Sequence, residues 1–201
     1  MPEKIGRRII LTSVIGALGG LGYLMSNWVG LLWGAWEISF DFEKNIPFVP
    51  GFVYFYVLVY PLLVSPVFTV KKYEDFLDVI LGYSVLIAVS LAIFMTLPTR
   101  IERPEHNLAG FAGWLFNAIY TVDGPCNLFP SLHVSSSVYI SFTNGYFCPK
   151  LKWISWLIAI LISISTILIK QHAIIDVAGG VGFGAVVYIF IRILRAQERS
   201  F

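Results

Sequence analysis

Long apolar runs follow one another along the chain, with short polar stretches between them. A helix that crosses a bilayer takes about 20 predominantly apolar residues, and six runs are long enough: 9–29, 52–70, 77–97, 130–147, 151–169 and 173–194. The pattern predicts an all-α, polytopic membrane protein. It would be a single membrane-embedded domain over 1–201, built as a bundle of six transmembrane helices.

A shorter apolar pattern lies between the third and the fourth runs. From 107 to 120, large apolar side chains recur at helical spacing, at Leu108, Phe111, Trp114, Leu115 and Ile119. This spacing predicts a short helix that lies in the membrane interface. Such a helix could be a lid or a headgroup guide beside a site, or only a packed connector.

Two pairs of glycines have the small-xxx-small spacing that lets helices approach closely. Gly16 and Gly20 lie in the first run, and Gly180 and Gly184 in the last. We interpret both pairs as positions of close helix packing.

Composition excludes a free-standing soluble globule. The chain is 57% hydrophobic and 13% charged, with a mean hydropathy of +0.78, whereas a soluble domain carries about 25% charged residues. The net charge of +2 and the scattered basic residues argue against a nucleic-acid partner. The two cysteines, Cys126 and Cys148, cannot form a disulfide framework.

Basic residues are unevenly divided between the two ends of the predicted helices. The side that carries both termini holds ten and the opposite side four, so the positive-inside rule places both termini in the cytoplasm. The first run follows basic residues as a signal peptide does, but it is too long for one, and we interpret it as a retained anchor. The ten are Lys4, Arg7, Arg8, Lys71, Lys72, Lys150, Lys152, Arg192, Arg195 and Arg199; the four are Lys44, Arg100, Arg103 and Lys170.

Ionisable residues gather at the outer ends of the runs, in the segments 96–104, 129–133 and 170–176. Such groups are costly at membrane depth, which makes them a functional hypothesis. His172 and Asp176 are spaced i,i+4, so on a helix they share one face and the carboxylate can fix the tautomer of the imidazole. His133 is a second imidazole that can act as acid or base.

An anion would be well held beside these histidines. Ser131 and the free N–H groups after Pro130 form a predicted helix N-terminus, which suits a phosphate, and Arg103 and Lys170 add positive charge. The set predicts phosphoryl transfer through a phosphohistidine. A metal held by the two histidines and the carboxylate is the competing interpretation, and the two cations argue against it. No metal and no other cofactor is predicted.

Three motifs at these positions resemble those of the type 2 phosphatidic acid phosphatase (PAP2) superfamily: Arg-Pro, Pro-Ser-x-His and a His-Asp pair. In this chain they are Arg103-Pro104, the segment 130–133, and His172 with Asp176. The resemblance implies a six-helix, metal-independent membrane enzyme. It makes His172 the nucleophile, with Asp176 to orient it. It makes His133 the acid that protonates the leaving oxygen and then the base that activates the acceptor.

The chain departs from the family pattern at three positions. Thr96 stands at the lysine of the first motif, Leu132 at the glycine of the second, and Thr166 at the arginine of the third. Lys170 and Arg100 would stand in for the two missing cations and bind the phosphate with Arg103 and Ser131. The sequences Pro-Ser-Leu-His and Lys-Gln-His resemble the branch that includes inositol phosphorylceramide synthases.

The resemblance implies a phosphatase of phospholipid metabolism that acts on a lipid phosphate, a phosphoric monoester. The protein would lie in the bacterial cytoplasmic (inner) membrane with its active site on the outer side. The bilayer and the lipid substrate are its expected partners, and the oligomeric state stays open. If an alcohol replaces water as the acceptor, the protein is a lipid phosphotransferase. A non-enzymatic lipid-binding membrane protein is the remaining alternative.

Overall fold

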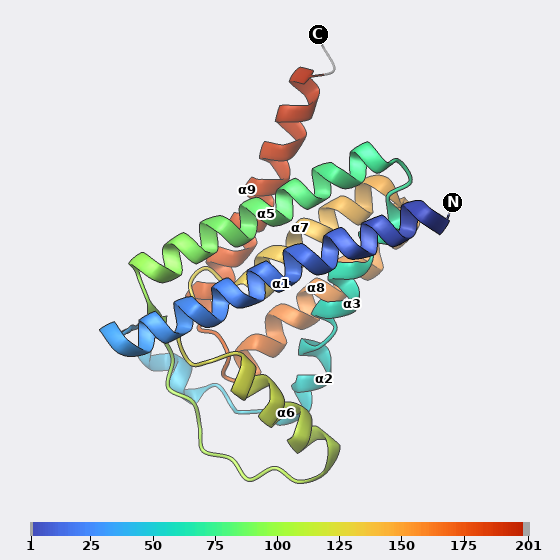
Figure 1. Cartoon of the computed structure of the whole chain (residues 1–201). Helices are drawn as coiled ribbons and strands as arrows, with labels where there is room; N and C mark the ends of the chain where they lie inside the picture. Colours follow the sequence, from blue (N-terminus) through green and yellow to red (C-terminus); the bar gives the residue numbers. More distant parts are fainter. Residues whose placement is uncertain (1, 199–201) are drawn as a thin grey trace.

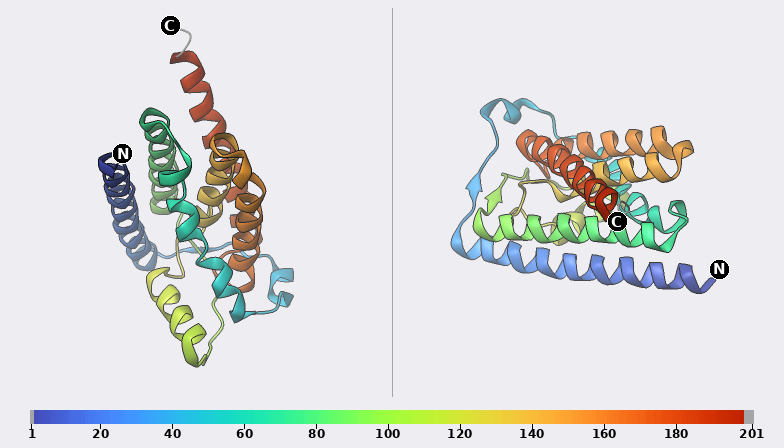
Figure 2. Two further views of the ribbon diagram at one scale, coloured as in Figure 1. Left: turned by 90° about the vertical axis from the view of Figure 1, so that its right-hand side faces the viewer. Right: turned by 90° about the horizontal axis from the view of Figure 1, so that it is seen from above.

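The computed structural model describes residues 2–198, with side chains from 5 onward, and is almost entirely helical. Of the basic residues named above, Lys4 and Arg199 lie outside the described side chains. The long helices are α1 (Pro2–Trp33), α5 (Tyr73–Thr96), α7 (Leu132–Phe147), α8 (Lys152–Leu168) and α9 (Ile174–Glu198). They form a bundle in which α1 and α5 run side by side on one flank (Figure 1). The end of α9 projects beyond the bundle (Figure 2).

The run 52–70 is helical but broken into short pieces. These are η2 (Pro50–Phe52), α2 (Val53–Tyr56), α3 (Val59–Val64) and α4 (Pro66–Thr69). Pro61 and Pro66 each lack the N–H of a continuous helix. Carbonyl groups near the breaks find side-chain donors: Ser65 Oγ donates to Leu62 O at 2.7 Å, and Tyr83 Oη donates to Leu63 O at 2.6 Å. Side chains thus supply hydrogen bonds where the backbone hydrogen bonds of the helix are interrupted, as a membrane-spanning segment requires.

The fourth predicted run forms the centre of the bundle. The helix α7 packs against α8, α9, α5 and α3, and its 16 residues include buried hydroxyl groups at Ser135, Ser136, Ser137 and Ser141. These serines donate to carbonyl oxygens within a turn of their own helix. Because α7 is enclosed by protein, it needs neither a full bilayer length nor an apolar surface.

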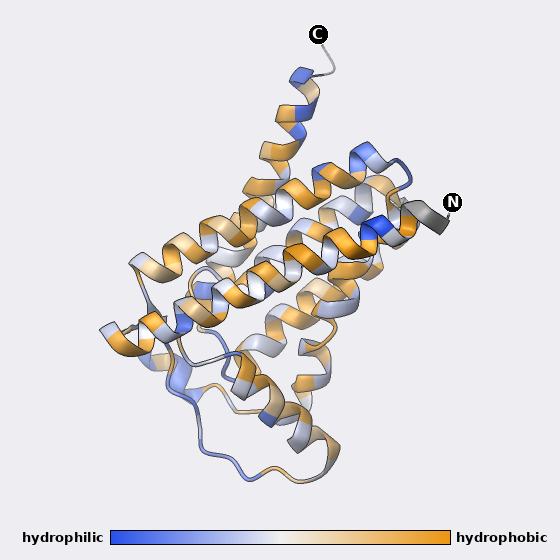
Figure 3. Ribbon diagram, in the orientation of Figure 1, coloured by the Kyte–Doolittle hydropathy of each residue, from blue (hydrophilic) through white to orange (hydrophobic). Residues whose placement is uncertain are grey.

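Five helical segments in the described part of the chain are long and apolar enough to cross a membrane, and the prediction of six is not confirmed. They are Ile5–Trp33, Pro50–Thr69, Tyr73–Thr96, Pro149–Leu168 and Ile174–Glu198; the last but one joins η3 (Pro149–Leu151) to α8. Apolar residues dominate these helices, while the loops at one end are hydrophilic (Figure 3).

The two glycine pairs play different parts. An added Cβ at Gly180 would lie 2.8 Å from Ser131 O, and one at Gly184 would collide with Ser135 O. This pair therefore allows α9 to approach α7, as predicted. At Gly16 and Gly20, by contrast, an added Cβ meets nothing within 4 Å. Their interpretation as packing positions is wrong, because α1 meets α5 through Gly19 and Gly22 instead.

Substitution of Gly184 should destabilise the bundle, and Gly182 provides a matched control on the same helix. Gly184→Ala forces a methyl group against the main chain of α7, which should cost about 1–3 kcal/mol. Gly182→Ala meets open space within 4 Å and should be neutral or slightly stabilising, since alanine favours a helix. Thermal unfolding of the two variants in detergent measures the difference. Equal melting temperatures would contradict the close approach of α7 and α9.

Loops cover one end of the bundle. A two-residue parallel pair joins β1 (Trp36–Glu37) to β2 (Thr99–Arg100), and η1 (Asp41–Asn45) follows β1. The predicted interfacial helix is present as α6 (Gly110–Val122). Its Phe116 and Ile119 pack with Tyr56 and Ile169, whereas Phe111 and Trp114 are exposed. We conclude that α6 is a packed element with one outward apolar side.

Candidate active site

The turn between α8 and α9 carries His172. The helix α8 ends at Leu168, and Thr166 O accepts both the N–H of Gln171 at 2.9 Å and that of His172 at 3.1 Å. Lys170 adopts a left-handed conformation with φ +53°, which a non-glycine side chain rarely takes. His172 therefore precedes α9 rather than lying on it. The prediction that it shares a helix face with Asp176 is wrong.

The turn nevertheless brings the predicted pair together. Asp176 lies in the first turn of α9 and its Oδ2 accepts the N–H of Ala173 at 2.8 Å. The same oxygen lies 3.5 Å from His172 Nδ1, and both side chains are buried. A carboxylate at Nδ1 favours the tautomer that carries its proton there, and leaves Nε2 with a free lone pair. In that tautomer Nε2 of His172 can accept a hydrogen bond or act as a nucleophile.

His133 is held by two residues that sequence reasoning did not select. Tyr56 Oη lies 2.9 Å from His133 Nε2 and donates to Asp123 Oδ2 at 2.5 Å. The Asp123 carboxylate itself is 3.8 Å from His133 Nε2. Tyr56 is fully buried, so its ring position is fixed by packing. His133 thus has its own carboxylate neighbour, Asp123, and the hydroxyl group of Tyr56 connects the two side chains.

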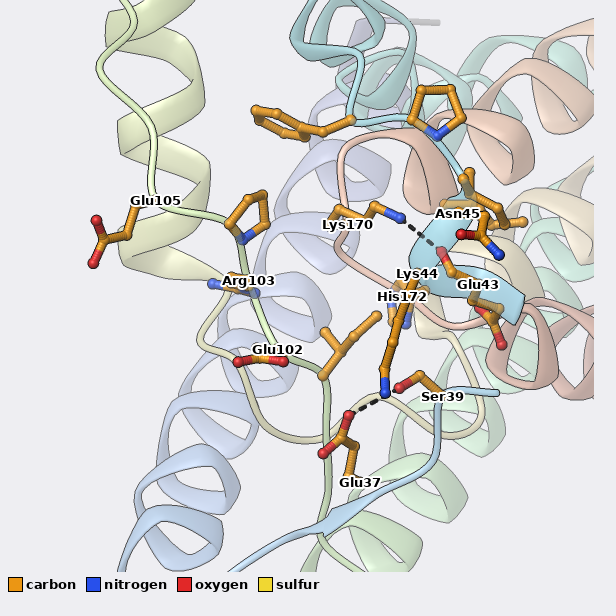
Figure 4. A pocket seen from close by; sticks show the side chains of 16 residues that line it. Glu37, Ser39, Glu43, Lys44, Asn45, Glu102, Arg103, Glu105, Lys170 and His172 are labelled. Carbon is orange, nitrogen blue, oxygen red and sulfur yellow. Dashed lines mark hydrogen bonds between the residues drawn. The ribbon is translucent and has the colours of Figure 1, made fainter. Parts of the chain in front are cut away.

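The two imidazole rings lie close together and face different cavities. Their centroids are 6.0 Å apart. His172 lines a polar cavity of about 710 Å³, which we call the outer cavity, formed by the segments 37–48, 101–105 and 167–172 (Figure 4). His133 lines an apolar cavity of about 350 Å³ between α1, α3, α5 and α7, which we call the inner cavity. A reacting group between the rings would have the charged and polar lining of the outer cavity on one side and the mostly apolar lining of the inner cavity on the other.

Two of the predicted cations, Lys170 and Arg103, line the outer cavity. Lys170 Nζ donates to Glu43 O at 3.1 Å; partial burial lowers the pKa of Lys170, while the Glu43 carboxylate raises it. Arg103 donates to Gln171 Oε1 at 2.5 Å and to the carbonyl oxygens of Asp123 and Gly124. Burial lowers the pKa of Arg103, and nearby tyrosine and aspartate side chains oppose the shift.

The remaining predicted phosphate ligands lie elsewhere. Arg100 is exposed, pairs with Glu37 in the two-stranded sheet, and lines neither cavity. Ser131 caps α7: its Oγ accepts the N–H of Val134 at 3.3 Å, and its own N–H donates to Asp176 O at 3.1 Å. Ser131 is fully buried and also lines neither cavity. Its observed contacts join the starts of α7 and α9, and so hold the two histidine-bearing segments together.

Glu43 is a further residue that the sequence did not reveal. Its Oε2 accepts the N–H of Ile174 at 2.9 Å and its Oε1 accepts that of Phe40 at 3.1 Å. The carboxylate thereby ties η1 to the first residue of α9, beside His172. A single acidic residue in a polar loop gives no signal for such a contact. Tyr56 was hidden in an apolar run, and Asp123, before Gly-Pro, had the features of an ordinary turn.

The fold and the site define an all-helical, integral, multi-pass membrane protein. No family model matches the chain, and no curated protein matches it. Among solved structures it is similar to the crystal structure of the first transmembrane PAP2-type phosphatidylglycerolphosphate phosphatase from Bacillus subtilis. The two are 16% identical, with a TM-score of 0.50 over 97% of this chain and 95% of that chain. The chain therefore has the membrane fold of a PAP2-type phosphatase.

Proposed function

We propose that this chain is a metal-independent lipid phosphate phosphatase of the PAP2 type, working through a phosphohistidine. The observation that carries the proposal is the arrangement of the two histidines. His172, with the Asp176 carboxylate 3.5 Å from its Nδ1, lies within 6.0 Å of the His133 ring, and the pair separates a polar from an apolar cavity. This geometry suits a phosphate whose leaving group is a lipid.

The proposed reaction has two displacements. His172 Nε2 attacks phosphorus and forms a P–N bond while the P–O bond to the lipid breaks, and the leaving oxygen takes a proton from His133. Neutral His133 then takes a proton from water, whose oxygen attacks phosphorus and breaks the P–N bond. Inorganic phosphate leaves and both histidines return to their starting states. Asp176 stabilises the positive charge that His172 acquires in the first step.

Charge on the equatorial oxygens must be compensated throughout. In our proposal Lys170 and Arg103 supply most of this charge, because they line the outer cavity beside His172. Lys170 supplies a point charge on a flexible stem, which replaces the planar fork of the family arginine. Arg100 would assist only if the short strand β2 moved toward the cavity.

The orientation of the protein is also a proposal. The histidine pair lies at the end of the bundle that carries Lys44, Arg100, Arg103 and Lys170, the side with fewer basic residues. The positive-inside rule places this end outside the cytoplasm. The substrate would therefore be a lipid phosphate of the outer leaflet of a bacterial inner membrane.

Release of phosphate in detergent tests the function. Purified protein is given phosphatidic acid, phosphatidylglycerol phosphate, a prenyl pyrophosphate and lipid A, with chelator and with or without alcohols. We expect phosphate release that survives the chelator and needs His172. Activity restored by one divalent metal would favour a metal site, and transfer to an alcohol without phosphate release would favour a phosphotransferase. No reaction with any of the four substrates would favour a lipid-binding protein.

Lys170 should be important for phosphate binding, and Lys44 is its matched control. Both lysines line the outer cavity, but Lys44 pairs with Asp41 at 3.0 Å and is exposed. Lys170→Ala should lower kcat/KM by about a hundredfold, while Lys170→Arg keeps part of it and Lys44→Ala is nearly neutral. Thr166→Ala should also be nearly neutral, because its hydroxyl donates to Ser163 O within α8 and its carbonyl remains. Steady-state kinetics of these variants test the role of Lys170 in phosphate binding. Wild-type activity in Lys170→Ala would contradict that role.

A further inference from the structure

The inner cavity runs along α1 from Thr12 to Leu24, and its outer end is formed by His133 and Asp123. Twelve residues of helix correspond to about 18 Å. Apart from that polar end, its walls are mostly aliphatic and aromatic side chains, among them Leu63 and Leu86. Its volume of about 350 Å³ is at the small end of the range for ligand sites, about 300–1,000 Å³.

Two glycines of α1 keep this cavity open. Gly16 and Gly20 line it, both are exposed, and an added Cβ at either position meets nothing within 4 Å. Side chains at these positions would enter the cavity or its mouth. The exposed glycines therefore mark the α1 wall of the cavity as a side that reaches the surface of the molecule.

We propose that the inner cavity binds one hydrocarbon chain of the lipid phosphate, with the ester oxygen of that lipid beside His133. This inference rests on the proposed function and names the part of the substrate that the site recognises. The phosphate would lie between the two histidines and face the outer cavity. The chain would descend along α1 toward the middle of the bilayer, as the tail of an outer-leaflet lipid does.

A helix from another protein chain is the alternative occupant, since glycines spaced i,i+4 also favour helix pairing. The shape of the cavity argues against it. A helix with its side chains is about 10 Å across, whereas this cavity has a volume of only about 350 Å³ and reaches inward to Asp123, His133 and Ser136. A flexible chain of single-carbon width can follow that path. The polar end suits an ester group.

The test introduces larger side chains on α1 that would fill the inner cavity. Gly16→Leu and Gly20→Leu each add a side chain in open space, and leucine favours a helix over glycine, so the fold should persist. Gly6→Leu is the matched control, because Gly6 is also exposed on α1 with nothing within 4 Å but does not line the cavity. Kinetics compare dipalmitoyl with dibutanoyl phosphatidic acid. A long-chain phosphatidic acid that carries a photoreactive diazirine in one chain reports binding.

We expect Gly20→Leu to lower kcat/KM by about tenfold for the long-chain substrate and to leave the short-chain substrate unchanged. Wild type should crosslink to the segment 12–24, and Gly20→Leu should lose that crosslink while Gly6→Leu keeps it. The crosslink requires no turnover, so the inference is tested even if phosphate release fails. Three results would overturn it: unchanged long-chain kinetics with an undiminished crosslink, equal losses for both chain lengths, or a dimer that Gly20→Leu dissociates.

Discussion

Replacement of His172 by alanine should lower turnover by roughly four to six orders of magnitude, because the nucleophile itself is lost. Asp176→Asn should retain more activity, since the nucleophile remains and only its orientation and charge compensation suffer. The asparagine carbonyl oxygen can still accept the N–H of Ala173, a bond that Asp176 Oδ2 makes at 2.8 Å. The start of α9 should therefore keep its structure in that variant.

Trapping of the intermediate identifies the attacking atom. When a lipid with labelled phosphate is mixed with enzyme and quenched in base, the label should be acid-labile, as expected for a P–N bond, and absent from His172→Ala. His106→Ala is a useful control, because that histidine packs among Phe116 and Tyr120 away from the pair. Label found on Ser131 would refute the mechanism.

His133→Ala should lower kcat/KM by a factor of similar size for alkyl phosphates but by a much smaller one for an aryl phosphate, because kcat/KM reports the first displacement and not the later hydrolysis, which needs His133 with either substrate. An alkoxide leaves poorly without a proton, whereas a nitrophenolate needs none, so removal of the general acid matters chiefly for the former. The values of kcat/KM for a long-chain alkyl phosphate and for nitrophenyl phosphate, each in wild type and variant, measure the contrast. If both substrates lose the same factor, His133 does not protonate the leaving group in the rate-limiting step.

Two neighbours of His133 refine this experiment. Tyr56→Phe removes the hydroxyl that joins His133 to Asp123, and Asp123→Asn removes the charge. Both variants should show the same dependence on leaving group as His133→Ala, with smaller losses, because the imidazole remains. The effects of the two substitutions on activity should not be additive, because both residues act on His133 through the same chain of contacts.

The sequence was sufficient to predict the membrane helices with long apolar surfaces. Such runs have a strong signal because lipid-facing residues must be apolar over a full bilayer length. The same rule explains why α7 was harder to describe: its serines bond to their own helix and face protein. The glycines of α1 show a further limit, because their spacing is compatible with either packing or an open cavity.

The candidate site could be predicted only in part. The proximity of His172 and Asp176 was predicted from helical spacing, but a turn before α9 brings them together instead. Their burial follows from the apolar surroundings. Lys170 takes a left-handed conformation that no rule for ordinary side chains favours. The contacts of Tyr56 with Asp123 and of Glu43 with Ile174 join residues 67 and 131 positions apart. Pairings so distant leave no periodic pattern in a single sequence.

The carboxylate of Glu43 has an electrostatic consequence for the substrate. A helix N-terminus attracts an anion, yet the first N–H of α9 is already bonded to Glu43 Oε2 at 2.9 Å. The Glu43 carboxylate thus occupies the position at which the N-terminus of α9 would otherwise attract a phosphate. In the proposed mechanism phosphate is then held by the cationic side chains of Lys170 and Arg103 rather than by this helix end. If the proposed function holds, a site without this helix end should release inorganic phosphate more readily, which favours repeated turnover over retention.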